Sequence, residues 1–337
     1  MLNVIISELN IVSLPEINSV YAIILYKGHN KDKTSDRSYR SISVCPLIAK
    51  GMDSYIRLLN IEKWNSAKAS TQFQGEGSSH ELSALLLTEV IQHSLHVSKK
   101  PMYALYLDAR SAYDRAVRQL LIRNLYFSGT TGQELIFINE RLQHRQTYCE
   151  WDKNLMGPID DTLGVEQGGV NSDSFYKLLN NEQLLVSQES ELGVTMGDIT
   201  ISAIGQADDV VLTSNNPYSL FNLLYLTKEY CSKYMVELVQ DKTKLQVFLP
   251  SSLTPFANYL KTSPLLSIDH NCLTFTDTAE HVGIIRSTTG NLPNLLDTIQ
   301  SKKKALVAVL PAGLAKAHRE NPTASIRANT LHGVRVL

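Results

Sequence analysis

The sequence contains few cysteines, and their spacing excludes several classes of protein. The 337 residues include only four, with no C-x-x-C pair: Cys45, Cys149, Cys231 and Cys272. Such wide spacing argues against a zinc cluster and against the disulfide framework of a small secreted domain. We therefore expect the protein to reside in a reducing compartment.

A signal peptide and a membrane-spanning run are also missing from the sequence. The N-terminus has no basic region followed by an apolar block and a small-residue cleavage site, and no apolar run approaches the length of a membrane span. Internal repeats and low-complexity segments are absent too. These absences predict an intracellular protein of the nucleus, the cytoplasm or both, without a membrane partner.

Net charge is nearly absent, but the charges are unevenly distributed. The formal total is -1. Residues 27 to 68 nevertheless carry nine basic and four acidic side chains, and residues 301 to 337 carry seven basic side chains and one acidic one. Basic ends around an acidic middle are typical of a cleft that binds a nucleic acid above metal-holding carboxylates. Solvated helix faces are the alternative interpretation.

What the sequence does contain is enough apolar material for a large core. Hydrophobic residues make up 43% of the chain, which predicts a globular protein of two or three sub-domains. Strands are predicted at residues 19–26, 101–109 and 244–250, and a hairpin within residues 199–214. Helices are predicted after Ser78, before Gly129 and after Asn216. This pattern predicts an α+β fold: an antiparallel sheet with helices packed on one face.

The hairpin carries the most informative short stretch, AIGQADDVVL at residues 203–212. Asp208 and Asp209 stand side by side at its tip, where like charges repel unless cations lie between them. Asp108 ends another predicted strand in YLDARSAYD. Three aspartates on adjacent strands can hold two Mg²⁺ ions for an in-line phosphoryl transfer. A solvated turn is the alternative for an isolated pair of aspartates.

Six blocks of the chain, in this order, resemble the reverse transcriptase domain of non-LTR (LINE-like) retrotransposons: RSYRSISVCPLIAK, YALYLDARSAYDRA, LGVEQGGVNSDSFYKLLNN, AIGQADDVVL, QDKTKLQVF and EHVGIIRS. The resemblance runs from about Tyr26 to Ser287, and KKKALVAVLPAGLAKAHRENP resembles the start of the helical thumb. It implies a right-hand polymerase, with an antiparallel palm sheet and packed helices, fingers and a partial thumb. The implied activity is RNA-directed DNA synthesis, in which a primer 3′-hydroxyl is extended with dNTPs on an RNA template.

The resemblance also assigns roles to individual residues. Asp108, Asp208 and Asp209 match the metal ligands, for Mg²⁺ or Mn²⁺, and Lys242 matches a lysine that protonates the pyrophosphate. Nucleotide-binding roles fall on seven residues: Lys27, Arg40, Ala109, Tyr113, Gln167, Gly168 and Gly169. Tyr113 would lie under the incoming sugar, or else be an ordinary core tyrosine. Gly283 matches the hairpin that grips the DNA primer.

The expected sub-domains follow the same blocks. Residues 1–100 would form the N-terminal part of the fingers, 101–125 the first part of the palm and 126–160 an insertion between fingers and palm. The nucleotide-pocket loop and the catalytic hairpin would occupy 161–250, the primer-grip region 251–290 and the partial thumb 291–337.

The chain also departs from the family pattern. Asp173 replaces the usual proline of the third block, and its charge is expected to weaken triphosphate binding. The short N-terminal region leaves no room for an endonuclease there, and the thumb is shorter than usual, so a fragment or a degenerate copy is expected. A catalytically silent relic that only binds nucleic acid is the main alternative. An RNA-templated RNA polymerase is disfavoured, since such enzymes usually keep a smaller polar residue where Tyr113 stands.

Overall fold

The protein is described here as a computed structural model. It covers residues 15–28, 32–35, 38–74, 79–151, 154–160, 162–256, 267–268, 271–273 and 275–288. The chain divides into two compact units, Met1–Ile284 and Ile285–Leu337, and every described helix and strand except the last strand lies wholly in the first. The expected thumb at 291–337 and the basic segment at 301–337 lie outside the described residues.

The central sheet is antiparallel, with the strand order β10-β3-β9-β8. Its strands are β3 (Met102–Leu107), β8 (Ala203–Gln206), β9 (Asp209–Ser214) and β10 (Lys244–Phe248). Strand β3 is buried along its whole length, because it is a central strand and both faces of the sheet are covered. The sheet therefore confirms the predicted α+β class and the antiparallel palm.

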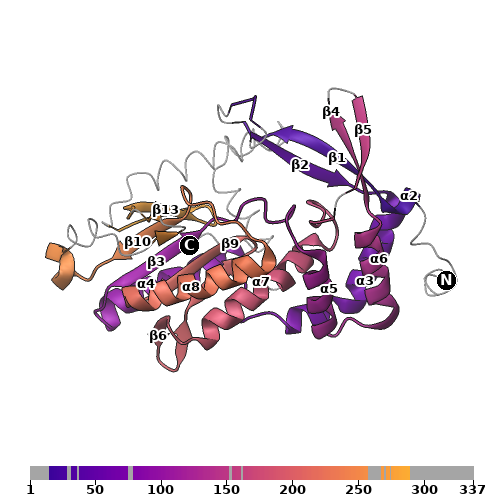
Figure 1. Cartoon of the computed structure of the whole chain (residues 1–337). Helices are drawn as coiled ribbons and strands as arrows, with labels where there is room; N and C mark the ends of the chain where they lie inside the picture. The colour runs from indigo at the N-terminus through magenta and orange to yellow at the C-terminus, as the bar shows by residue number, and fades with distance from the viewer. Residues whose placement is uncertain are drawn as a thin grey trace, which may run out of the picture. The chain divides into compact units, whose positions relative to one another are not determined.

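Helices cover both faces of this sheet, so the expectation of helices on one face was wrong. On one side, α4 (His80–Gln92) packs Leu87 and Val90 against β3 and β9. On the other side, α7 (Ser172–Glu189) and α8 (Pro217–Tyr234) supply Leu184 and Leu223 to a second core cluster. Figure 1 shows α7 and α8 running side by side across the strands. In the sequence, β3 is a continuous apolar run instead of an alternation of apolar and polar residues. Such a run is typical of a strand that is covered on both faces of its sheet.

A second sheet has the order β2-β1-β4-β5 and stands apart from the first in Figure 1. It consists of β1 (Ser19–Tyr26), β2 (Tyr39–Val44), β4 (Gln146–Trp151) and β5 (Asn154–Asp160). Strand β1 pairs antiparallel with β2 and parallel with β4, so segments more than a hundred residues apart meet in one sheet. A core cluster below it joins α3 (Leu47–Ser66), α5 (Arg118–Phe127) and α6 (Gly132–Gln143).

The remaining elements are short. They are α2 (Pro15–Asn18), the π-helical turn η3 (His93–Val97), β6 (Val194–Met196), β7 (Ile199–Ile201), the 3-10 helix η4 (Ser251–Phe256), β11 (Ser267–Ile268), β12 (Asn271–Cys272), β13 (Thr278–His281) and β14 (Ile284–Ser287). Among the described helices, none combines the length and apolar character that crossing a bilayer requires.

The predicted helix starts are largely confirmed. Asn216 caps α8 by accepting a hydrogen bond from the Tyr218 amide at 2.8 Å, and Pro217 occupies the first turn. Helix α4 is capped by Ser79, whose hydroxyl accepts from the Leu82 amide at 3.2 Å. The predicted cap, Ser78, lies outside the described residues.

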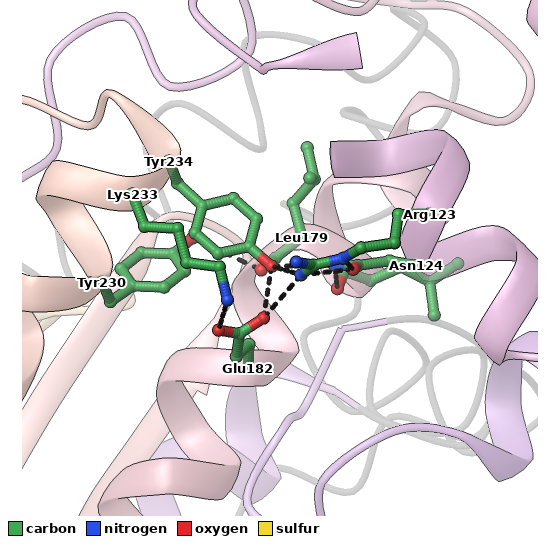
Figure 2. Close-up of polar contacts among 8 residues, drawn as sticks. Arg123, Asn124, Leu179, Glu182, Tyr230, Lys233 and Tyr234 are labelled. Atoms are coloured by element: carbon green, nitrogen blue, oxygen red, sulfur yellow. Dashed lines mark hydrogen bonds and ion pairs between the residues drawn. The ribbon is translucent and has the colours of Figure 1, made fainter. Parts of the chain in front are cut away.

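A polar junction joins helices α5, α7 and α8 (Figure 2). Glu182 of α7 lies at its centre and accepts from the guanidinium of Arg123 at 2.8 Å and from the Tyr234 hydroxyl at 2.6 Å. Lys233 pairs with the other carboxylate oxygen. Burial raises the pKa of Glu182, but the hydrogen bonds from Lys233 and Tyr234 outweigh it and hold this pKa below its usual value. The junction fixes α7 relative to its two neighbours.

Helix α7 is buried along most of its length and places a lysine in the interior. Lys177 is fully buried, and its ammonium group donates to Oδ1 of Asn65 at 2.7 Å. Burial lowers the pKa of this lysine to about 8. Since the unfolded chain would hold the proton up to its ordinary pKa near 10.5, the folded state loses it first as the pH rises.

We expect the free energy of unfolding to rise between pH 8 and pH 10.5 because of Lys177. The pKa difference sets an upper limit of about 3 kcal/mol on this gain. In Lys177→Met the contribution is absent, so the variant should be more stable than the parent near pH 7 and lose that advantage by pH 10.5. Urea unfolding at both pH values measures the difference, with Lys244→Met, an exposed lysine on β10, as the control. An advantage that does not change with pH would contradict the prediction.

Candidate active site

The candidate site begins with strand register. Strand β3 pairs with β9 so that Leu107 lies opposite Val210. Asp108 directly follows the last residue of β3, and Asp209 is the first residue of β9. Antiparallel pairing therefore places these two carboxylates at the same end of two neighbouring strands, as the sequence predicted.

Asp208 joins them from a tight hairpin. Gln206 pairs with Asp209, which leaves Ala207 and Asp208 as a two-residue turn. Ala207 has a φ of 56°, a left-handed conformation that costs an ordinary L-residue about 1 kcal/mol or more. The side-chain amide of Asn180 on α7 donates to the Ala207 carbonyl at 2.9 Å, and Asn180 is almost fully buried. This hydrogen bond holds the turn that presents Asp208.

Burial and neighbouring charges raise the pKa values of both residues of the Asp208–Asp209 pair. Burial, and after it the charges of Asp208 and Asp108, raises the pKa of Asp209 to about 6. Burial also raises the pKa of Asp208, Asp108 adds to this effect, and Arg40 and Lys242 oppose it. Both residues of the pair are exposed by surface area, so it is the protein packed around their carboxyl groups that desolvates them. The result is a concentration of negative charge, which Arg40 and Lys242 oppose at Asp208 and His80 opposes at Asp209.

Charge and ligand type suit a divalent cation, whereas the positions of the side chains do not form a finished metal site. Carboxylate oxygens are the ligands that Mg²⁺ and Mn²⁺ prefer. Within the described parts of the chain, however, no three His, Cys, Asp or Glu side chains lie close enough together to hold a metal ion. Lys242 contacts Asp108 instead, with its ammonium nitrogen 3.3 Å from Oδ1. Its side chain is 66% exposed, so it can turn away into solvent.

The backbone around Asp108 explains the position of Lys242. The Asp108 carbonyl accepts from the Val239 amide at 2.8 Å, and Ala109 forms an isolated bridge with Leu238. The chain then turns back at Thr243 before β10 begins. Lys242 stands on this turn, directly beside the end of β3.

Tyr113 lies in the turn that follows Asp108. The Val165 amide donates to the Tyr113 carbonyl at 2.8 Å, which ties this turn to the start of the glycine loop. Its ring stacks on Tyr176 of α7, with the ring centres 4.7 Å apart and the planes 23° from parallel. Its hydroxyl accepts from the Gln74 amide at 3.2 Å. Burial is the main cause that raises the pKa of Tyr113, and Asp208 adds to it, so the ring lies within electrostatic reach of the hairpin.

Residues 167–169 form a loop against the second sheet. The Gln167 carbonyl accepts from the Ser43 amide of β2 at 2.9 Å, and Gly168 has a φ of 99°, which glycine tolerates best. A Cβ on Gly169 would lie 2.6 Å from the Ser172 hydroxyl oxygen. The second glycine of the loop is therefore required by close packing as well.

Arg40 lies on β2 of the second sheet, and Lys27 directly follows β1. The charge of Arg40 on β2 lowers the pKa of Asp208. Lys27 follows β1 and lowers the pKa of Asp114 instead, whose main shift is upward from burial. The structure thus connects Arg40 with the carboxylate site and leaves the role of Lys27 as a prediction. Gly283 lies in the turn between β13 and β14 with a φ of 80°, as a tight hairpin requires.

Comparison with known proteins identifies the family. The profile described as Reverse transcriptase (RNA-dependent DNA polymerase) matches residues 29–310 of this chain. The chain belongs to the reverse transcriptase family. Comparison with curated proteins gave no match.

The reverse transcriptase fold of the chain is also similar to solved structures of telomerase from Candida tropicalis. One, the apo form truncated from its C-terminal domain, has a TM-score of 0.53 at 14% identity and covers 82% of this chain and 54% of its own. The apo form has a TM-score of 0.55 at 12% identity, covering 82% and 48%. The likeness shows a shared right-hand polymerase architecture. The chain spans about half the length of these telomerases.

One contact that the sequence argument missed changes the charge expected near the candidate site. Asp173 was expected to add an uncompensated negative charge, but the Arg57 guanidinium lies 2.9 Å from its Oδ1 and 3.4 Å from its Oδ2. The two residues are 116 positions apart. No local pattern predicts this pair, and the expected repulsion is reduced accordingly.

Asn180 was missed as well, and its hydrogen bond gives a direct prediction. In Asn180→Leu the turn loses the bond to Ala207, so the hairpin peptide 203–214 should exchange its amide hydrogens several times faster. The unfolding free energy should fall by about 1 kcal/mol, since a half-buried carbonyl loses its partner.

Hydrogen exchange read by mass spectrometry measures the local effect, and Asn181→Leu is the matched control. Asn181 is also buried on α7, but it donates to the Ala67 carbonyl at 2.7 Å and accepts from the Ala69 amide. Its loss should destabilise the protein without selectively exposing the hairpin. Equal exchange of peptide 203–214 in the parent and in Asn180→Leu would refute the role of Asn180.

Proposed function

We propose that this chain is the polymerase core of a non-LTR (LINE-like) retrotransposon reverse transcriptase, which extends a DNA primer on an RNA template with dNTPs. The observation that carries the proposal is the meeting of Asp108, Asp208 and Asp209 at one end of the central sheet. Burial and the negative charge of Asp108 raise the pKa values of Asp208 and Asp209, while Arg40 and Lys242 oppose the shift at Asp208. The retrotransposon origin rests on the six ordered sequence blocks.

The three aspartates would hold Mg²⁺, or Mn²⁺ in its place. When bound, such an ion balances charge on the phosphates and lowers the pKa of the attacking hydroxyl. The protein supplies the hard oxygen ligands and the low-dielectric surroundings that raise their affinity for a cation. Because Lys242 pairs with Asp108 through an exposed side chain, cation binding would release this lysine for the phosphates of the nucleotide.

The other predicted residues fit roles around a nucleotide. Arg40 suits a forked contact to the triphosphate, and Lys27 a point charge beside it. Lys242 would deliver a proton to the departing pyrophosphate. Gly168 and Gly169, with Gln167, would let the backbone approach the base pair closely. Ala109 offers its carbonyl oxygen next to Asp108, and Gly283 would support the primer end.

We also propose that the sub-domains follow the predicted division. Residues 1–100 and 126–160 contribute to the fingers, because they supply the second sheet. Residues 101–125 and 161–250 contribute the palm, because they contain all four strands of the central sheet. The primer-grip region would be 251–290 and the partial thumb 291–337.

Asp208→Asn tests the proposed activity. The amide keeps the shape of the side chain and removes its charge, so primer extension on poly(rA)/oligo(dT) should fall by about a hundredfold or more, as for the loss of several kcal/mol of charge stabilisation. The matched control is Asp198→Asn, since Asp198 also holds the second position of a two-residue turn, between β6 and β7. Binding of the RNA–DNA duplex, measured by fluorescence anisotropy, should remain.

The same assay distinguishes the relic hypothesis. A parent protein that binds the duplex but does not extend the primer with Mg²⁺ or Mn²⁺ would be a nucleic-acid-binding relic. Equal extension by the parent and by Asp208→Asn would remove Asp208 from the proposed mechanism.

Tyr113→Ala tests the choice of DNA over RNA synthesis. The ring lies within electrostatic reach of Asp208 and, in this proposal, occupies the space that a ribose 2′-hydroxyl would need. Opening that space should raise ribonucleotide incorporation relative to deoxyribonucleotide by about ten- to a hundredfold, as for the relief of a clash of roughly 1.4 to 3 kcal/mol. Single-nucleotide incorporation with matched dNTP and rNTP pairs measures the ratio. If both rates fall together, Tyr113 only packs the core.

A further inference from the structure

A short segment before α4 is attached directly to the strand that leads into the catalytic hairpin. The Gly205 amide of β8 donates to the Thr71 carbonyl at 2.9 Å, and the Phe73 amide donates to the Gly205 carbonyl at 2.8 Å. Gln72 and Gly205 form a parallel bridge. The two hydrogen bonds of Gly205 fix the register of this segment against β8. Gln74, the residue after Phe73, therefore has a set position relative to β8.

Gln74 points from this segment to Tyr113. Its side chain is buried, its amide nitrogen donates to the Tyr113 hydroxyl at 3.2 Å, and its backbone amide donates to the Gln72 side chain at 3.2 Å. Tyr176 stacks on the face of the Tyr113 ring. The ring is therefore held at its face by α7 and at its hydroxyl by the segment bonded to β8.

Burying the Gln74 side chain destabilises the fold unless its amide group forms hydrogen bonds. Its Oε1 is buried and has no hydrogen-bond partner among the described residues. An unpaired buried polar atom destabilises the fold, whereas a leucine would fill a similar volume without that cost. Packing alone therefore does not account for the amide, and the bond to Tyr113 is the interaction that only an amide or a similar donor provides.

Steric exclusion depends on where the excluding ring is held. A ring that can pivot makes room for a 2′-hydroxyl at little cost, and a ring fixed at two points cannot. We propose that Gln74 is a positioning residue that sets the sugar selectivity of this enzyme by holding Tyr113 at a fixed distance from the hairpin of Asp208 and Asp209. This inference rests on the proposed function, since it assigns Tyr113 the sugar-excluding role.

The test compares Gln74→Leu with the parent. Single-nucleotide incorporation is measured with dTTP and UTP opposite template adenine, and binding of the same nucleotides is measured at equilibrium with Ca²⁺ present to prevent turnover. Gln74→Leu should raise the UTP-to-dTTP ratio by about three- to tenfold, the range for one net neutral hydrogen bond. Incorporation of dTTP should fall by less than the selectivity changes.

Three further variants separate positioning from packing. Tyr113→Phe removes the hydroxyl and keeps the ring, so it should reproduce the effect of Gln74→Leu, and the double variant should add nothing. Gln183→Leu is the matched control, since the amide of Gln183 is also buried and donates to a hydroxyl, that of Thr227, at 3.3 Å. It should leave the ratio unchanged.

The outcomes distinguish this inference from the proposed function. If the parent and Gln74→Leu discriminate between the sugars equally well, the role of Gln74 is overturned and the proposed function is not. An additive double variant, or an equal effect of Gln183→Leu, overturns it too, because the change would then reflect general loosening. A parent that neither extends primers nor prefers dTTP in binding overturns the proposed function and the inference with it.

Discussion

The register between β3 and β9 is the constraint on which the site depends. It forces Asp108 and Asp209 to the same end of the central sheet, where burial and then the charges of Asp208 and Asp108 raise the pKa of Asp209. Such an arrangement destabilises the folded protein unless other groups offset it. The hydrogen bond from Asn180 holds the left-handed turn of the hairpin, and the ammonium group of Lys242 offsets part of the negative charge of Asp108. The fold thus holds carboxylates that repel one another close together at the end of the central sheet.

Helix α7 connects this end of the sheet to the rest of the molecule. It carries Tyr176 under the ring of Tyr113, Asn180 under the hairpin and Glu182 in the junction with α5 and α8. A helix buried on most sides usually consists of apolar residues, whereas α7 uses amides, a lysine and a carboxylate to make directed contacts. Its position is therefore specified by hydrogen-bond geometry as well as by shape.

The sequence predicted what is local and periodic. It located β1, the capped start of α8 and the hairpin with its two carboxylates, since each is encoded by neighbouring residues. It missed the Arg57–Asp173 pair and the contact of Asn180 with Ala207, because these join distant segments whose meeting is decided by tertiary packing. The helices on both faces of the sheet were missed because the continuous apolar run of β3 was taken to indicate a strand, but not a strand covered on both faces. The roles of all the candidate site residues stay predictions, including the metal-ligand roles and those of Lys27 and Gly283.

The parallel pairing of β1 with β4 has a consequence for folding while the chain is being synthesised. Ser19 lies beside Gln146, so the second sheet cannot close until more than a hundred further residues have left the ribosome. Loops of this length close slowly, and β1 meanwhile presents an open edge. Its Tyr21, Ile23 and Leu25 side chains remain exposed even in the folded protein. The interval between synthesis of β2 and of β4 is thus the period in which a nascent chain is most open to mispairing or to capture by a chaperone.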